Sequence, residues 1–515
     1  MYYLLVGAGS AGCVVANRLS EDAGVTVLLI EAGEDDWSNP NITIPGLAVA
    51  TWRTDIDWAY STEKQNGTML GFTDEVSYWP RGKVLGGTSS INGMQFVRGS
   101  KHDYDRWAKY TGAEDWNYEH VLPYFKRMED MQIPELRGSE YHGQGGPLPI
   151  NRIKSQPVAS KIVEAAQNVG YPYNADYNGA TMEGISHSQV NAQNDERWSS
   201  SRAYIHPITH RPNLHVAVKS HVQKIVISNK MAEAVEVIKG GRKYTIKVKK
   251  EVILSAGAIG SPQILLLSGV GPRKQLEQLK IPVVADLPVG ENLHDHVFFD
   301  MGVKIKEPLS SKFDSPTSWW TYLEYKIFGT GLLTSAYQVE ALAFKSTTKE
   351  TREIDWPDLE IHFFTYLPHT DSNSWSYTND VNADLAERDT TNYGFRCLPS
   401  LLRPESRGRI ALRSRDPFDY PVIWTNYLSQ QEDLELLIRG VQECKKIVDA
   451  KPLKDIGAEL TETTPARACK QYRYDSHEYW SCVLKLRPLT IYHPVGTCKM
   501  GPSDDPSAVV DAQLR

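Results

Sequence analysis

The chain has 515 residues, of which 41% are hydrophobic and 23% charged, and its formal net charge is −7. This composition is typical of a folded globular protein, and the negative charge argues against nucleic acid as a partner. The sequence has no run of about 18 uninterrupted apolar residues, so no transmembrane segment is predicted. The length exceeds what one compact core usually holds, which predicts two domains or one elaborated domain.

The first dozen residues carry the most informative motif. An apolar run at residues 4–6 predicts a strand, and the pattern G-x-G-x-x-G follows it directly at residues 7–12. In such a turn the first glycine permits the tight bend and the second lets the backbone approach a pyrophosphate. The third lets the helix pack on the strand, and the helix N-terminus offers amide donors. The sequence therefore predicts a dinucleotide site at Gly7, Gly9, Ser10, Ala11 and Gly12.

A second predicted strand supports this interpretation. Residues 25–30, apolar except for Thr26, predict a second buried strand, and Glu31 follows it directly. An acidic residue about 20 positions beyond the glycines is placed to accept the ribose hydroxyls of an adenosine. The strand, turn, helix, strand and acid together predict a dinucleotide-binding βαβ unit.

A second glycine-rich stretch covers residues 82–94. Its four glycines between residues 82 and 93 allow a backbone to lie close against a flat ligand. The apolar side chains between them predict that the stretch is buried rather than a surface loop. These side chains are Val84, Leu85, Ile91 and Met94.

The segments between residues 101 and 257 are predicted to form helices and strands that support the fold. Residues 101–130 and 157–170 show helical spacing of apolar side chains. Short strands between residues 215 and 253 predict a small antiparallel insertion, and residues 251–257 return to a buried strand.

The six cysteines are scattered and contain no C-x-x-C pair, so the sequence predicts no metal centre and no dense disulfide framework. Cys469 and Cys482 are spaced so that they could pair, and free buried thiols are the alternative.

Two further motifs complete a set that spans nearly the whole chain. They are residues 289–296 (Val-Gly-Glu-Asn-Leu-His-Asp-His) and residues 492–501 (Tyr-His-Pro-Val-Gly-Thr-Cys-Lys-Met-Gly). With the two glycine-rich stretches and residues 257–271, they give the chain a clear resemblance to the glucose–methanol–choline (GMC) oxidoreductases. Within that family it is similar to the choline dehydrogenase-like and invertebrate glucose dehydrogenase-like members.

The resemblance implies an α/β fold with a Rossmann-like FAD-binding domain and an interleaved α+β substrate domain, an antiparallel sheet flanked by helices. It implies an N-terminal region over residues 1–297, mostly FAD-binding. Residues 298–515 then hold the substrate domain and the C-terminal region with its His-Pro motif. The family's last segment, with a second catalytic Asn or His, is expected beyond Arg515 and is missing here. By resemblance the flavin is lined by Val84, Gly87, Asn92 and Gly93, and the adenine by Val222.

The resemblance also assigns catalytic roles. His493 of the His-Pro motif is expected to be the base that takes the hydroxyl proton, and His294 and His296 are expected to be structural or supporting. Glu340 could meet a quaternary ammonium substrate, or could be a structural ion-pair partner. Ile91 stands where some relatives attach flavin through a histidine, so FAD is expected to be non-covalent. His187, His206, His362 and His369 carry no motif and are expected to be ordinary.

The function implied is an FAD-dependent oxidation of an alcohol: choline, a sugar or another primary alcohol. The electron acceptor could be oxygen, a quinone or a carrier. A flavin-binding lyase and an inactive flavoprotein fragment of the same fold are the alternatives. Candidate substrate-pocket segments are residues 319–322 and 331–340. The compartment and the oligomeric state are not predicted.

Overall fold

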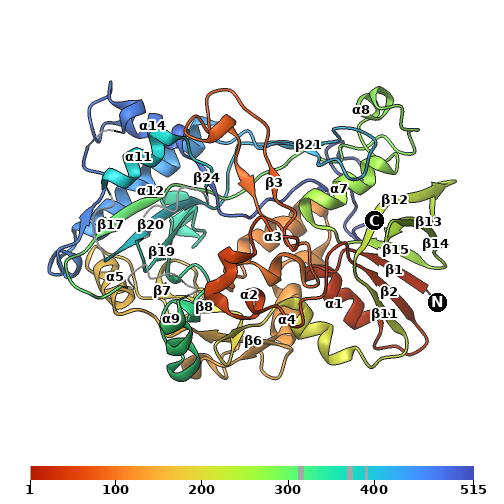
Figure 1. Cartoon of the computed structure of the whole chain (residues 1–515), viewed down its shortest axis with the longest axis horizontal. Helices are drawn as coiled ribbons and strands as arrows, with labels where there is room; N and C mark the ends of the chain where they lie inside the picture. The colour runs from red at the N-terminus through yellow and green to blue at the C-terminus, as the bar shows by residue number, and fades with distance from the viewer. Residues whose placement is uncertain (1, 311–317, 368–374, 389–392, 465) are drawn as a thin grey trace.

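The computed structural model describes residues 2–310, 318–367, 375–388, 393–464 and 466–515. His369 lies outside these ranges. Two sheet regions lie side by side along the long axis of the molecule (Figure 1). The region that contains β1 lies to the right with both ends of the chain, and a larger sheet lies to the left.

The first region is built on a four-stranded parallel sheet. Its strands are β1 (Tyr2–Val6), β2 (Thr26–Ile30), β11 (Leu214–Ala217) and β15 (Glu251–Leu254), in the order β11-β2-β1-β15. Helix α1 (Ser10–Leu19) connects β1 to β2 and packs its apolar face on them. The predicted βαβ unit is therefore confirmed.

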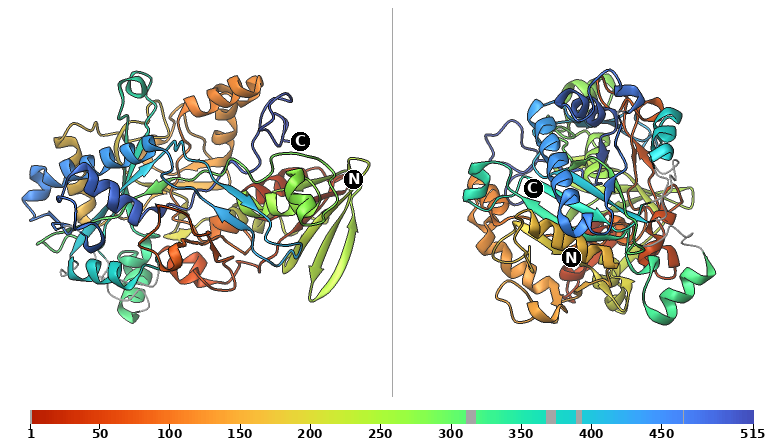
Figure 2. Two further views of the ribbon diagram at one scale, coloured as in Figure 1. Left: turned by 90° about the horizontal axis from the view of Figure 1, so that it is seen from above. Right: turned by 90° about the vertical axis from the view of Figure 1, so that its left-hand side faces the viewer.

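The predicted antiparallel insertion forms beside this sheet. It consists of β12 (Ser220–Ser228), β13 (Met231–Lys239) and β14 (Arg242–Lys247), and its long strands project from the body in Figure 2. One strand assigned to it was wrong. Residues 214–217 pair in parallel with β2, because this short apolar strand extends the buried sheet instead of the exposed one.

The larger sheet has eight antiparallel strands drawn from distant parts of the chain. Its order is β23-β17-β20-β19-β18-β7; β16 also pairs with β20, and β24 pairs with β16. The bounds are β7 (Gly184–His187), β16 (Val297–Phe298), β17 (Met301–Lys304), β18 (Val339–Lys345), β19 (Leu359–Phe364), β20 (Gly394–Leu401), β23 (Glu459–Leu460) and β24 (Leu489–Thr490). Helices α5 (Pro157–Asn168), α12 (Gln431–Asp449) and α14 (His477–Leu486) pack with it around the largest hydrophobic core.

The helices predicted within residues 101–130 and 157–170 are confirmed as α3 (Lys101–Thr111), α4 (Tyr118–Met128) and α5. Residues of α7 (Gly257–Leu267) line the site described below, and α6 (Ser200–Tyr204) and α9 (Trp319–Leu323) are two further helices. Among the residues that the structure describes, no helix is both long enough and apolar enough to cross a lipid bilayer.

Four of the cysteines form two disulfides. Cys397 joins Cys444, which ties β20 to the covering helix α12, and Cys469 joins Cys482 in the middle of α14. The 469–482 pair resolves the alternative that the sequence left open. The 397–444 pair was missed because the two residues are 47 positions apart.

A buried ionic cluster lies beside the parallel sheet region. The Arg98 guanidinium donates to Glu129, and the two ring nitrogens of His142 lie 2.9 Å from carboxylate oxygens of Glu129 and Asp176. Burial opposes the charged form of His142, but hydrogen bonds and charges from Asp176 and Glu129 outweigh it and raise the pKa of the imidazole. Each charge in the cluster is therefore partnered.

Candidate active site

A cavity of about 600 Å³ lies where the carboxyl ends of β1 and β2 meet the N-terminus of α1. It is the place where a parallel α/β sheet usually binds its ligand. The predicted residues that line it are Gly7, Gly9, Ser10, Ala11, Glu31, Gly87 and Val222.

Two helix N-termini face this cavity. Gly9 is the N-cap of α1 and Ala256 is the N-cap of α7, and neither has a side chain that accepts a hydrogen bond from the first amides of its helix. The first intrahelical bond of α1 runs from the Cys13 amide to the Gly9 carbonyl, so the amides of Ser10 and Ala11 remain available. Two uncapped N-termini provide the donors and the positive dipole ends that a pyrophosphate needs. This arrangement fits FAD.

Glu31 lines the same cavity directly after β2. One carboxylate oxygen accepts from the Ala8 amide and the other from the Gly33 amide, each at 2.9 Å. Burial raises the pKa of Glu31, and these two backbone bonds oppose that rise. Because each oxygen can accept a second hydrogen bond, the fixed carboxylate can still bind ribose hydroxyls.

Four predicted cofactor residues lie outside the cavity lining. Gly12 packs behind it, where an added Cβ would lie 2.0 Å from the Gly7 carbonyl oxygen. Val84 is fully buried in a cluster with Ile42, Ile56 and Ile91. Asn92 accepts a bond from Arg197 at 2.7 Å, and Gly93 faces the ring of Tyr337. Their roles toward flavin stay predictions.

Sequence reasoning missed part of the lining. Trp58, Tyr60 and His221 line the cavity, and so do residues 255–261 and 494–498, most of which belong to two of the motifs named above. The motifs themselves could have identified the last two segments. The three rings carry no local signal: Trp58 lies just before the short strand β3 (Tyr60–Ser61) that holds Tyr60, and His221 lies far along the chain in β12.

His493 precedes this lining, and a buried carboxylate fixes its backbone. The Asp295 side chain accepts from the His493 amide at 2.9 Å and from the hydroxyls of Tyr427 and Thr490, each at 2.5 Å. Tyr492, directly before it, has a φ of 68°, which is unusual for a bulky residue. Such strain persists only where the surroundings enforce it, and it is concentrated at functional sites.

The His493 ring is accessible to solvent, yet dense protein surrounds it. Desolvation first, and then the charges of His296, His362 and Arg81, lower the pKa of His493 well below its usual range. The imidazole is therefore uncharged at neutral pH, which is the form that accepts a proton. Its Nδ1 lies 3.1 Å from Nδ1 of His296.

An aromatic cluster lies between the glycine-rich stretch at residues 82–94 and the His-Pro motif. Ring centroids of Tyr78, Tyr337, Trp375 and Tyr492 lie 5.6–5.9 Å from that of Trp52. The Trp52 indole donates to the Tyr337 hydroxyl at 2.9 Å. The cluster thus links the stretch that holds Gly93 to the residue before His493.

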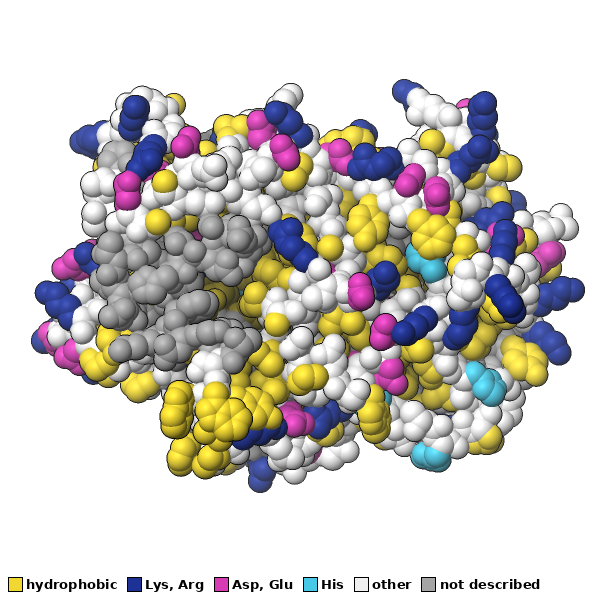
Figure 3. Space-filling view, in the orientation of Figure 1, with side chains coloured by type: hydrophobic (Ala, Val, Ile, Leu, Met, Phe, Trp, Pro, Cys, Tyr) yellow, Lys and Arg dark blue, Asp and Glu magenta, His cyan; other side chains and the backbone are white. Residues whose placement is uncertain are grey.

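Other predicted site residues lie apart from the cavity lining. Glu340 is 1% exposed on β18 and accepts from the Gln156 amide at the start of α5. Burial raises its pKa to about 8. Trp319 and Trp320 of α9 are 67% and 77% exposed, and Figure 3 shows apolar side chains gathered on this face at the position of α9. Their expected place in a substrate pocket stays a prediction.

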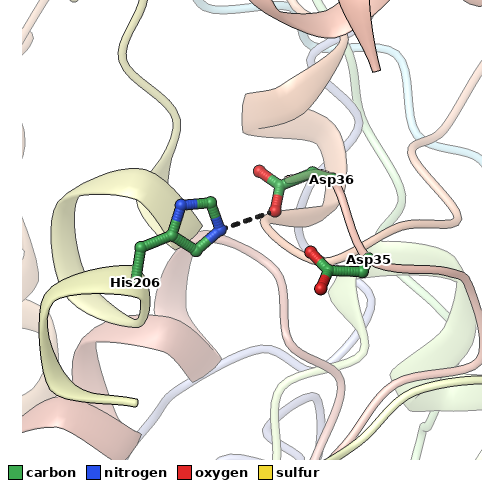
Figure 4. Close-up of side chains that lie close together, drawn as sticks. All are labelled: Asp35, Asp36 and His206. Carbon is green, nitrogen blue, oxygen red and sulfur yellow. Dashed lines mark hydrogen bonds and ion pairs between the residues drawn. The ribbon is translucent and has the colours of Figure 1, made fainter. Parts of the chain in front are cut away.

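Asp35, Asp36 and His206 form a cluster beside the loop after β2 (Figure 4). The His206 ring lies 2.9 Å from a buried Asp36 oxygen, and the hydroxyls of Ser199 and Ser201 donate to the other oxygen. These contacts fasten the loop to α6 and the turn that follows it.

The sequence profile of the GMC oxidoreductases matches residues 1–298 and 404–515. The chain is 39% identical over 518 residues to "Glucose dehydrogenase [FAD, quinone]" of Drosophila melanogaster, covering 100% of this chain and 80% of that protein. It is 36% identical to "Choline dehydrogenase, mitochondrial" of Mus musculus (100% and 82% covered) and to "Alcohol dehydrogenase [acceptor]" of Pseudomonas putida (100% and 88%).

Solved structures of other oxidases share the fold of this chain. Pyridoxine 4-oxidase from Mesorbium loti superposes with a TM-score of 0.81 at 26% identity, covering 100% of this chain and 91% of that chain. A formate oxidase gives a TM-score of 0.83 at 25% identity with the same coverage. The predicted fold class, with its Rossmann-like FAD-binding and α+β substrate parts, is confirmed. The chain belongs to the GMC oxidoreductase family and is an FAD-dependent oxidoreductase.

Proposed function

We propose that this enzyme oxidises a small primary alcohol, with His493 as the base and FAD held without a covalent bond. Choline, a sugar and simple alcohols are the substrate classes, by analogy with the named relatives. The observation that supports the proposal most is the state of His493. Its ring is uncharged and accessible, and Asp295 fixes its backbone next to the residues that line the cavity.

The residues of the chain suit the proton half of this reaction. An alcohol is a weak acid, so its proton leaves easily only to a base within about 3 Å. Bound FAD supplies the acceptor for the hydride and its two electrons. The Asp295 contact and the strained Tyr492 backbone restrict where the His493 ring can lie, which lowers the cost of orienting it. The low-dielectric surroundings strengthen the polar contacts made there.

The test replaces His493 with alanine in the FAD-loaded enzyme. We expect kcat/KM for dye-linked alcohol oxidation to fall by about 10²- to 10⁴-fold, the usual contribution of a positioned acid–base group. Flavin content is expected to stay normal. His477→Ala is the control, because that histidine lies exposed on α14. Activity within threefold of the wild type would place the base elsewhere.

A second experiment tests the flavin linkage and its redox role. Ile91 is buried among aliphatic side chains and has no nucleophilic atom, so acid precipitation is expected to release all flavin into solution. A yellow pellet would contradict the non-covalent proposal. Anaerobic alcohol should bleach the flavin, whereas a lyase would leave it oxidised. Oxygen uptake compared with reduction of a quinone then identifies the acceptor.

A further inference from the structure

We infer that His296 is a positioning residue that sets the tautomer of His493 and leaves Nε2 of His493 as the proton-accepting atom. This inference rests on the proposed role of His493. It assigns a defined task to a histidine that the sequence suggested only as structural or supporting.

Three polar groups form a chain of contacts. His296 directly precedes β16, and its Nε2 lies 2.9 Å from the carbonyl oxygen of Leu402. Its Nδ1 lies 3.1 Å from Nδ1 of His493, and the two ring planes meet at 72°. Among the described residues, His296 provides the one hydrogen bond that the His493 ring makes.

The chemistry of the carbonyl decides where each proton lies. A carbonyl oxygen can only accept, so the hydrogen of an uncharged His296 must be on Nε2. Its Nδ1 then has a lone pair and can only accept. The contact between the two Nδ1 atoms therefore requires His493 to donate from Nδ1. An uncharged His493 with hydrogen on Nδ1 has its lone pair on Nε2.

This arrangement gives the proton of the alcohol a defined destination. The hydroxyl O–H bond breaks, its proton forms a bond to Nε2 of His493, and the electron pair stays on the alcohol oxygen. His493 becomes an imidazolium, and its Nδ1–H bond to His296 strengthens because the donor is now charged. His296 therefore stabilises both the basic form and the product form of His493.

The other groups around the pair do not replace this contact. Asp295 is committed to the His493 backbone and to two hydroxyls. Glu360 pairs with His362 at 3.0 Å, and the Arg81 guanidinium donates to the Tyr492 carbonyl at 2.7 Å. Of these groups, His362 and Arg81 lower the pKa of His493 through their charges, and within the described part of the chain none of them contacts its ring nitrogens.

The test compares two substitutions at His296 in the FAD-loaded enzyme. His296→Leu removes the acceptor and is expected to lower kcat by about 10- to 100-fold with little change in KM, because His493 then loses its preferred tautomer. The acid limb of the kcat–pH profile should change, because the substitution removes a group whose charge and hydrogen bond both act on the His493 ring. His296→Asn keeps an acceptor oxygen near the Nδ1 position and should recover most of the rate. His477→Leu is the remote control.

A double substitution separates this inference from the proposed function. If His296 acts only through His493, adding His296→Leu to His493→Ala should cause no further loss of rate. A further loss, or a His296→Leu enzyme with wild-type kcat and pH profile, would overturn the inference while His493 remained the base. A His493→Ala enzyme with near-normal activity would instead overturn the proposed function. Flavin content and melting temperature, measured for every variant, show that each one folds.

Discussion

Gly9 and Gly12, the second and third glycines of the motif at residues 7–12, should respond differently to one added methyl group. A Cβ on Gly12 would lie 2.0 Å from the Gly7 carbonyl oxygen and 2.8 Å from Oγ of Ser255. A Cβ on Gly9 would meet Cα of Gly87 at 3.9 Å, which is ordinary van der Waals contact. Gly9 has a φ of −78°, a value that alanine adopts without strain.

The magnitudes follow from these distances. The Gly7 carbonyl is backbone in the buried β1–α1 turn, so Gly12→Ala must push α1 away from β1. Overpacking of this kind costs about 1–3 kcal/mol of folding free energy, and more where backbone blocks relaxation. Gly9→Ala leaves the fold intact but puts a methyl group beside the donors expected to bind pyrophosphate. Loss of one charged hydrogen bond, about 1.5–3 kcal/mol, weakens FAD binding about 10- to 150-fold.

The assay measures thermal unfolding of flavin-free protein and FAD binding by titration calorimetry for each variant. Gly12→Ala should lower both the melting temperature and the FAD affinity. Gly9→Ala should lower the affinity alone. A Gly12→Ala protein with normal melting, or a Gly9→Ala protein that binds FAD normally, would refute this account of the turn.

Two further substitutions test buried polar contacts. Asp295→Ala leaves two hydroxyls and the His493 amide without their acceptor. The free energy of unfolding should therefore fall by about 3 kcal/mol or more, and kcat/KM by at least about 10-fold. A variant with unchanged stability and unchanged kcat/KM would contradict the role of this carboxylate. The raised pKa of His142 means that its stabilisation is complete below about pH 6.5 and is lost as pH rises through the folded-state value. The melting deficit of His142→Gln should therefore be largest near pH 6 and shrink toward pH 9, and a constant deficit would count against the charged cluster.

Local pattern was enough to predict the nucleotide-binding unit. The apolar runs, the spacing of the glycines and the acid at Glu31 are all determined within about 30 neighbouring residues, as is typical of a βαβ unit. Helical spacing of apolar side chains likewise predicted α3, α4 and α5, and in α5 it marks the buried face. The resemblance to GMC oxidoreductases then identified His493 as the candidate base. The residues around it in the sequence do not reveal which groups form hydrogen bonds with it.

Tertiary structure decided the contacts that give those residues their properties. His296 and His493 are 197 positions apart, and Asp295 reaches the His493 amide only because β16 pairs with β24. The same dependence explains the missed 397–444 disulfide and the misassigned strand β11. The sequence by itself determined which segments form the nucleotide turn and which histidine lies in the family motif. Sheet register and long-range packing decided what that histidine contacts, because strand pairing over such separations depends on the whole core rather than on neighbouring residues.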